Sequence, residues 1–323
     1  MSAPTPATRP AAAEVAARTE DIAFTEAGSG RGLRGWTRAH GFTPAMWFVV
    51  PGVVFMLAFF IYPLIYGVAL SFQGDAGPFS AYREFFSDQF PHDSGSLHSL
   101  WVTLKLAIPG ALINVAAAVP IAWRMRGAMR GKRLITALVM VPMTLGSVFV
   151  AEGMIMFLGG TGWFNRVLLD LHLIQSPLKL IGNYTAVLIA IVITGFPFAF
   201  LLMLGYVSGI DPNLDKAAAM LGARPSQRFR KVTLPLLLPG LTITFALSFV
   251  LAFAVFPSAT LVGNDAGPTR VISKIAYNEY AFAHYANASA TAVIMGVVQL
   301  AVLGVIFFVR SRLYRGSTAG GKG

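Results

Sequence analysis

The sequence predicts an all-α, polytopic membrane protein, and three observations lead to that prediction. Hydrophobic residues make up 55% of the 323 residues and charged residues only 12%, whereas soluble domains usually carry about 25% charged residues. The mean hydropathy is +0.65. Apolar runs of roughly the length that a spanning helix needs, about 20 residues, recur along the chain. We therefore expect a bundle of about six transmembrane helices that forms one domain.

The expected spans follow from the length of each apolar run. They lie at about residues 46–72, 100–123, 134–158, 184–210, 235–262 and 288–309. Several contain proline or glycine, which membrane helices tolerate where neighbouring groups satisfy the freed carbonyls, so kinks are expected. A shorter amphipathic segment, residues 163–171, is expected to lie along the external surface.

Charge sets the expected orientation and the domain boundaries. Of the 25 Lys and Arg residues, 19 fall in residues 1–45, 124–133, 211–233 and the stretch after residue 309. The positive-inside rule places these segments in the cytoplasm. We expect a disordered cytoplasmic tail over 1–45, the transmembrane domain over 46–310 and a cytoplasmic tail over 311–323. Because the net charge of +11 is explained by topology, it gives no support to nucleic-acid binding.

Residues 211–235 form a polar, basic segment between two apolar runs, and we expect two short helices joined at a tight corner. Asp211 can cap a helix that starts at Pro212, and Gly222 stands where a left-handed C-terminal cap is needed. The enclosed helix has about ten residues and is roughly 15 Å long. Its small residues leave the backbone open to close approach by another protein, which predicts a docking site.

This segment resembles the motif of binding-protein-dependent ABC importer permeases: Glu-Ala-Ala, three residues, Gly, nine residues, an aliphatic residue, one residue, Leu-Pro. The matching positions are Lys216, Ala217, Ala218, Gly222, Val232, Leu234 and Pro235. The departure is Lys216, which replaces the usual Glu. The resemblance implies a coupling helix that fits a cleft of the ATPase. The residues expected at that interface are Asp215, Lys216, Ala217, Ala218, Ala219, Gly222 and Arg224.

The resemblance also implies partners and a location. It identifies the chain as the permease subunit of an ATP-driven importer in the bacterial inner membrane, surrounded by lipid. The implied partners are a cytoplasmic ABC ATPase dimer that uses the ATP, a second permease subunit, identical or homologous, and an external solute-binding protein. The chain itself is then not an enzyme and binds no cofactor.

The solute class rests on weaker likenesses. The residues Leu261-Val-Gly263 with the following loop resemble permeases for polyamines, aminoethylphosphonate and related small charged solutes, which is the reading we favour. Gly267-Pro-Thr269 and Tyr277 also resemble sugar permeases, the alternative. A stand-alone secondary transporter or channel is the alternative from another class, and it leaves the docking segment unexplained. An intramembrane enzyme requires a catalytic cluster that the sequence does not show.

Glu152 is the main candidate for the solute path. An ionisable residue inside a span costs at least about 2.5 kcal/mol on insertion scales, so a partner or water is expected. It can meet a cationic solute group, it can pair with Lys105, or it can lie near enough to the outer interface to be in contact with water. Further candidates for the path are Asn114, Phe253, Phe256, Ser258 and Gln299. The five histidines show no metal-ligand spacing, so no metal site is expected.

Overall fold

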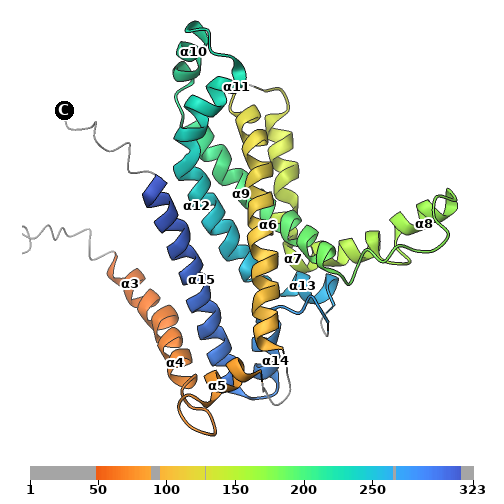
Figure 1. Cartoon of the computed structure of the whole chain (residues 1–323), viewed down its shortest axis with the longest axis vertical. Helices are drawn as coiled ribbons and strands as arrows, with labels where there is room; N and C mark the ends of the chain where they lie inside the picture. The colour runs from red at the N-terminus through yellow and green to blue at the C-terminus, as the bar shows by residue number, and fades with distance from the viewer. Residues whose placement is uncertain (1–48, 89–94, 128, 265–266, 314–323) are drawn as a thin grey trace, which may run out of the picture. The chain divides into compact units, whose positions relative to one another are not determined.

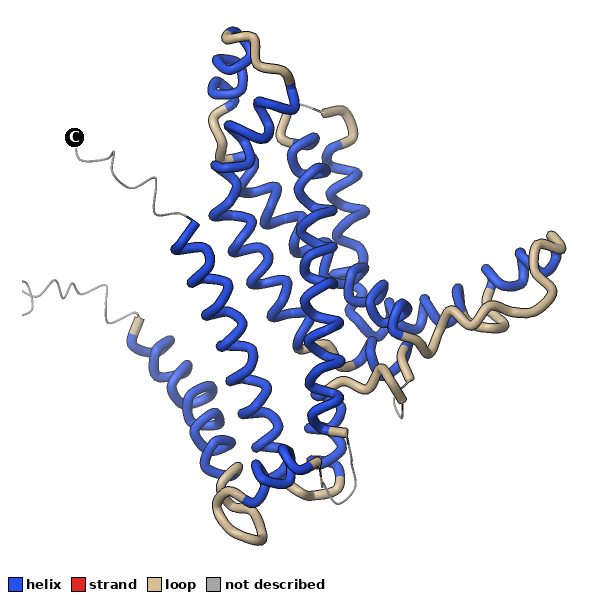
Figure 2. Tube along the Cα trace, in the orientation of Figure 1, coloured by secondary structure: helices blue, strands red, loops and turns tan. Residues whose placement is uncertain are grey.

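The computed structural model describes residues 49–88, 95–127, 129–264 and 267–313, and within those ranges it contains helices and loops and no strand (Figures 1 and 2). The prediction of an all-α bundle is confirmed, since six of the described helical segments are long and apolar enough to cross a membrane. The chain divides into two compact units, residues 1–66 and 67–323. The tail expected over 1–45 and the last ten residues lie outside the described residues.

The first unit contains the start of the first span. Helix α3 (Val50–Met56) leads through the π-helical turn η2 (Leu57–Ile61) into α4 (Tyr62–Leu70), which continues into the second unit. In η2 the N–H of Tyr62 donates to the carbonyl of Leu57, five residues back. Pro63 follows directly, and a proline ring clashes with the carbonyl four residues before it. The wider turn accommodates that proline without ending the helix.

The second unit contains the other five spans and their connecting helices. The long helices are α6 (Ser96–Met125), α7 (Lys132–Leu158), α9 (Tyr184–Ser208), α12 (Leu234–Phe253) and α15 (Tyr285–Leu313). The shorter elements are α5 (Ser80–Ser87), α8 (Trp163–Asp170), α10 (Pro212–Met220), α11 (Pro225–Arg228), η3 (Phe229–Thr233), α13 (Pro257–Val262) and α14 (Ile272–Ala281).

Helix α6 is the centre of the packing, and it contacts α9 and α12 most extensively. Its buried stripe consists largely of small residues, among them Ala107, Ala111, Ala118 and Ala122, which are all fully buried. A Cβ added at Gly110 would come within 2.7 Å of a methyl group of Ile191 on α9. In lipid the hydrophobic effect does not drive helices together, so they associate through close van der Waals packing. Small residues allow that packing, because they let the helix backbones approach each other.

The span expected over 235–262 differs from the observed element at both ends. At its end, α12 stops at Phe253 and α13 begins only at Pro257. The residue before a proline is disfavoured in the helical region, and Phe256 adopts φ −135° and ψ −62°. At its start, α11, η3 and α12 follow one another without a gap from Pro225. The second short helix expected in the coupling segment is therefore the extension of the fifth span.

The turn η3 repeats the arrangement seen before Pro63. The N–H of Leu234 donates to the carbonyl of Phe229, five residues back, and Pro235 follows. A π turn thus precedes both Pro63 and Pro235, and the helix continues through each of them. The closing Leu-Pro of the motif therefore does not separate the coupling segment from the membrane span.

Helix α7 is broken in its middle. Gly146 adopts φ 78° and ψ 164°, a conformation available essentially only to glycine. The break follows Pro142 by four residues. The expected kinks thus include a true interruption of the helix, set by a glycine and not by the proline itself.

Candidate coupling site and solute path

The ends of α10 confirm the predicted caps. The side chain of Asp211 accepts a hydrogen bond from the N–H of Asn213 at 2.9 Å, and Pro212 occupies the first turn. At the other end Gly222 has φ 78°. Its N–H donates to the carbonyl of Ala219 at 3.0 Å, and the N–H of Ala223 donates to Ala218 at 3.1 Å. This pair of bonds is a Schellman motif, which fixes both the length and the exit direction of the helix.

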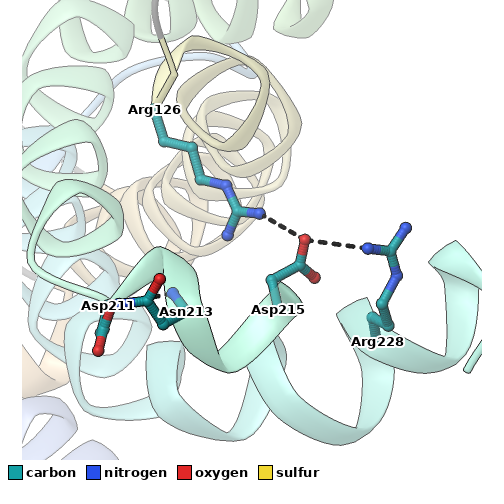
Figure 3. Close-up of polar contacts among 5 residues, drawn as sticks. All are labelled: Arg126, Asp211, Asn213, Asp215 and Arg228. Atoms are coloured by element: carbon teal, nitrogen blue, oxygen red, sulfur yellow. Dashed lines mark hydrogen bonds and ion pairs between the residues drawn. The ribbon is translucent and has the colours of Figure 1, made fainter. Parts of the chain in front are cut away.

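Asp215, on the inward face of α10, forms ion pairs with two arginines. Oδ2 of Asp215 accepts hydrogen bonds from Arg126 at 3.0 Å and from Arg228 at 3.2 Å (Figure 3). The three side chains are only 20%, 23% and 19% exposed for Arg126, Arg228 and Asp215. Arg126 follows the last residue of α6 and Arg228 ends α11. The carboxylate therefore links the coupling helix to the second span and to the start of the fifth.

Aromatic packing reinforces this link. The rings of Trp123 on α6 and Phe229 on η3 lie 5.4 Å apart in an edge-to-face arrangement. The guanidinium of Arg126 lies 5.3 Å from the centre of the Trp123 ring, within cation–π range. The coupling segment and the adjacent end of α6 thus form one packed unit.

The opposite face of α10 is open. Lys216 is exposed, and so are Ala217, Ala219 and Gly222, whereas Ala218 is half-buried. Met220 and Leu221 are 86% and 88% exposed. Arg224, at the corner before α11, is also exposed.

Sequence reasoning missed four residues of this site. The charge pattern assigns Arg126 and Arg228 only to topology, although a carboxylate inside the helix, Asp215, among so many cations is a signal for pairing. Met220 and Leu221 were overlooked, although two large apolar residues directly before a glycine corner, in a segment that lies outside the spans, are typical of a docking surface.

Glu152 lies on α7, beyond the break at Gly146. Its side chain is exposed and forms no hydrogen bond or ion pair with any residue that the structure describes. Lys105 is among the residues that it does not contact in this way. Gly153 beside it has open space where a Cβ would be. The flanking residues Ala151 and Met154 pack with Val262 of α13. Glu152 is six residues from the end of α7, or roughly 9 Å along a helix axis.

The other expected path residues belong to several different helices. Asn114 on α6 is 1% exposed and faces α9, where a Cβ on Gly195 would come within 2.5 Å of its amide nitrogen. Phe253 is fully buried and packs on Phe249, with ring centres 5.6 Å apart. Gln299 is half-buried on α15.

Phe256 and Ser258 lie at the start of α13, the short helix that packs against α7. The ring of Phe256 lies 5.1 Å from that of Tyr277 and 6.0 Å from the Nζ of Lys274. Ser258 is fully buried, and its hydroxyl has no hydrogen-bond partner among the described residues. Phe256 and Ser258 are therefore the expected path residues on a helix that packs directly against the helix of Glu152.

Comparison with known proteins identifies the family to which the sequence is similar. The family described as "Binding-protein-dependent transport system inner membrane component" matches residues 110–315, a range that includes the coupling segment. The chain is 30% identical over 211 residues to a "Probable sulfate transport system permease protein cysT" of Prototheca wickerhamii, covering 65% of this chain and 80% of the relative.

Two further relatives carry other solutes in their names. The spermidine/putrescine permease protein PotB of Haemophilus influenzae is 31% identical, over 51% of this chain and 58% of PotB, so the match spans little more than half of that relative. The trehalose/maltose permease protein MalF of Thermococcus litoralis is 26% identical over 78% of this chain and 88% of its own.

The fold is also that of solved importers. A chain of a bacterial ABC transporter involved in the import of the acidic polysaccharide alginate aligns over 87% of this chain and 100% of its own, with a TM-score of 0.74 and 19% identity. The same kind of transporter in complex with an alginate pentasaccharide-bound periplasmic protein gives a TM-score of 0.73 at 19% identity, over 88% of this chain and 98% of its own. Since the family match covers well over half of the sequence, the chain belongs to the inner-membrane components of binding-protein-dependent transport systems and is the permease subunit of an ABC importer.

Proposed function

We propose that this subunit converts ATP-driven movement of a cytoplasmic ATPase into the opening and closing of a solute path. The observation that carries the proposal is the construction of α10. It is capped at both ends, held on one face by the ion pairs of Asp215, and open on the other face. A rigid helix with an open face suits docking, because little conformational entropy is lost on binding.

The residues at the ATPase interface are the open ones of the predicted set together with the two apolar residues at the corner. Gly222 keeps the corner compact, and the side chains that face the ATPase are Lys216, Ala217, Ala219, Met220, Leu221 and Arg224. Asp215 acts from the inner side, where it transmits displacement of α10 to α6 through Arg126. The continuous helix from α11 through η3 into α12 supplies a second route for the same motion.

The remaining partners follow from this role. The ATPases form a dimer in the cytoplasm, a second permease subunit completes the path, and a solute-binding protein delivers the solute from outside. Both termini and the segments 124–133 and 211–233 are cytoplasmic, because Lys and Arg are concentrated there. The chain binds no cofactor of its own, and ATP is used by the partner.

The solute that we favour is a small organic cation or zwitterion of the polyamine or aminoethylphosphonate type. The support is Glu152, an exposed carboxylate in a candidate span without an ion-pair partner among the described residues. A carboxylate in such a place is costly unless it meets water or a counter-charge. With α7 leading outward from the cytoplasm, Glu152 lies near the external opening of the path. The name of the PotB relative points to the same solute class.

A sugar is the second candidate, since MalF matches a larger share of this chain than PotB does. A neutral sugar requires hydrogen-bonding groups and not a net charge at Glu152. The two candidates therefore differ in how they respond to removal of that charge.

The test is uptake of radiolabelled putrescine, 2-aminoethylphosphonate and maltose by cells that express the complete transporter. For a cationic solute group, Glu152→Gln is expected to lower uptake about tenfold, the equivalent of one charge contact, with assembly and basal ATP hydrolysis retained. Asp170→Asn removes an exposed carboxylate outside the candidate path and is the matched control. Unchanged uptake of the transported solute in Glu152→Gln would remove the residue from the path. Maltose uptake that is insensitive to the change would assign the transporter to sugars.

A further inference from the structure

The exposed charges of the coupling segment, residues 211–235, indicate what kind of partner can bind it. Four cationic side chains of the coupling segment, Lys216, Arg224, Arg230 and Lys231, are exposed and take part in no ion pair with any described residue. The segment from 211 to 235 contains only two acids. The surface is therefore strongly basic unless those acids neutralise it.

Asp215 is not available to do so, and Asp211, although exposed, lies at the start of α10, at the other end from the Gly222 corner. Asp215 forms its ion pairs with Arg126 and Arg228 on the inner side (Figure 3). Its side chain is only 19% exposed. Asp211 caps the other end of α10, where it serves the N–H of Asn213. The outer face thus presents Lys216 as its charged group, in the place where the family motif has a carboxylate.

Two large apolar side chains accompany the charge. Residues four apart lie on the same face of a helix, so Met220 stands beside Lys216. Met220 and Leu221 are 86% and 88% exposed, and they end α10 directly before the Gly222 corner. Exposed apolar groups of this size next to a cation favour a partner with a pocket over contact with water alone.

We infer that the ATPase subunit paired with this chain receives α10 in an acidic cleft, with carboxylates against Lys216 and Arg224 and an apolar floor under Met220 and Leu221. This inference rests on the proposed coupling role and adds the chemistry of the partner's surface. Protein interfaces pair opposite potentials, and like charges placed together select against wrong partners. Anionic lipid headgroups are the competing occupant, but they adjoin the ends of the spans, whereas α10 lies beyond the ends of α6 and α7 (Figure 1).

The direct test uses the complex purified from membranes of the native host through a tag on this chain. A carbodiimide joins a lysine amine to a touching carboxylate by an amide bond and adds no spacer atoms. The expected product is a peptide pair that joins Lys216 to an Asp or Glu of a subunit whose sequence contains nucleotide-binding motifs. Lys216→Arg keeps the charge without the reactive amine, so it is expected to lose this product while the ATPase still copurifies. Lys231→Arg is the matched control and should leave the product in place.

Charge reversal supplies the second readout. Lys216→Glu is expected to weaken ATPase association at least about tenfold, and more so at low salt than at high salt, because exposed charges are screened. Undiminished association of Lys216→Glu, with no cross-link at Lys216 in the wild-type complex, would overturn the acidic cleft and would fit contact with lipid. Failure of any ATPase to copurify with the wild-type chain would instead overturn the coupling role itself.

Discussion

Asp215→Asn tests whether the ion pairs under α10 hold the coupling helix to the spans. The amide keeps the size and shape of the side chain and removes its charge. Arg126 and Arg228, which approach the same oxygen at 3.0 Å and 3.2 Å, would then face each other without a counter-ion.

The magnitude follows from the burial of the three side chains. Exposed ion pairs contribute about 0–1 kcal/mol, whereas breaking a fully buried pair costs about 3–5 kcal/mol. These side chains are 19–23% exposed, which discounts the second limit, and each lost bond is charge-assisted, worth about 1.5–3 kcal/mol. We expect a loss of about 2 kcal/mol in the stability of the coupling region.

The assay combines thermal unfolding of the purified subunit with a double-mutant cycle. Asp215→Asn and Arg126→Met are each expected to lower the unfolding midpoint, and the double variant should lose less than the sum of the two. Asp211→Asn is the matched control, because asparagine caps a helix as well as aspartate does, so it should change stability by no more than a few tenths of a kcal/mol.

Uptake per ATP hydrolysed distinguishes a transmitting role of Asp215 from a purely structural role, which would leave that ratio unchanged. With the link loosened, ATP hydrolysis by the complete transporter is expected to continue while uptake per ATP falls. Strict additivity within about 0.5 kcal/mol in the cycle, together with normal uptake per ATP, would refute the assignment of Asp215 as the transmitting residue.

Three further predictions concern the backbone and the orientation. Gly222→Trp is expected to uncouple uptake from ATP hydrolysis, because φ 78° is strained for any other residue and the ring blocks close approach; copurified ATPase with normal uptake would contradict this. Gly146→Ala is expected to cost about 1–3 kcal/mol from its glycine-only conformation, whereas Gly153→Ala on the same helix, which meets open space, should not lower the unfolding midpoint, because alanine favours a helix more than glycine does. In this cysteine-free chain, Gly127→Cys and Ser226→Cys should resist an impermeant thiol reagent in intact cells, and labelling of both from outside would reverse the topology.

Local sequence features were sufficient for the spans and for α10. A spanning helix needs only a long apolar run, and a capped helix needs only Asp-Pro at its start and glycine at its end, so these elements follow from neighbours in the chain. The break between α12 and α13 was less visible, because residues 254–262 contain no charged residue and continue the apolar run, although Pro257 is a signal for it.

What only the tertiary structure decided is which charges meet. Asp215 and Arg126 are 89 residues apart, and Asp215 could have paired with any of several nearby cations or faced the ATPase itself. The packing of α6 against α9 and α12 brings the end of α6 beside α10 and thereby turns the carboxylate inward. Glu152 is the opposite case, since Lys105, one of its possible partners, forms no ion pair with it and the side chain stays exposed. Sequence specified the residue types, and the distances that assign their roles arise from helix packing, because Coulomb interactions depend on separation in space and not along the chain.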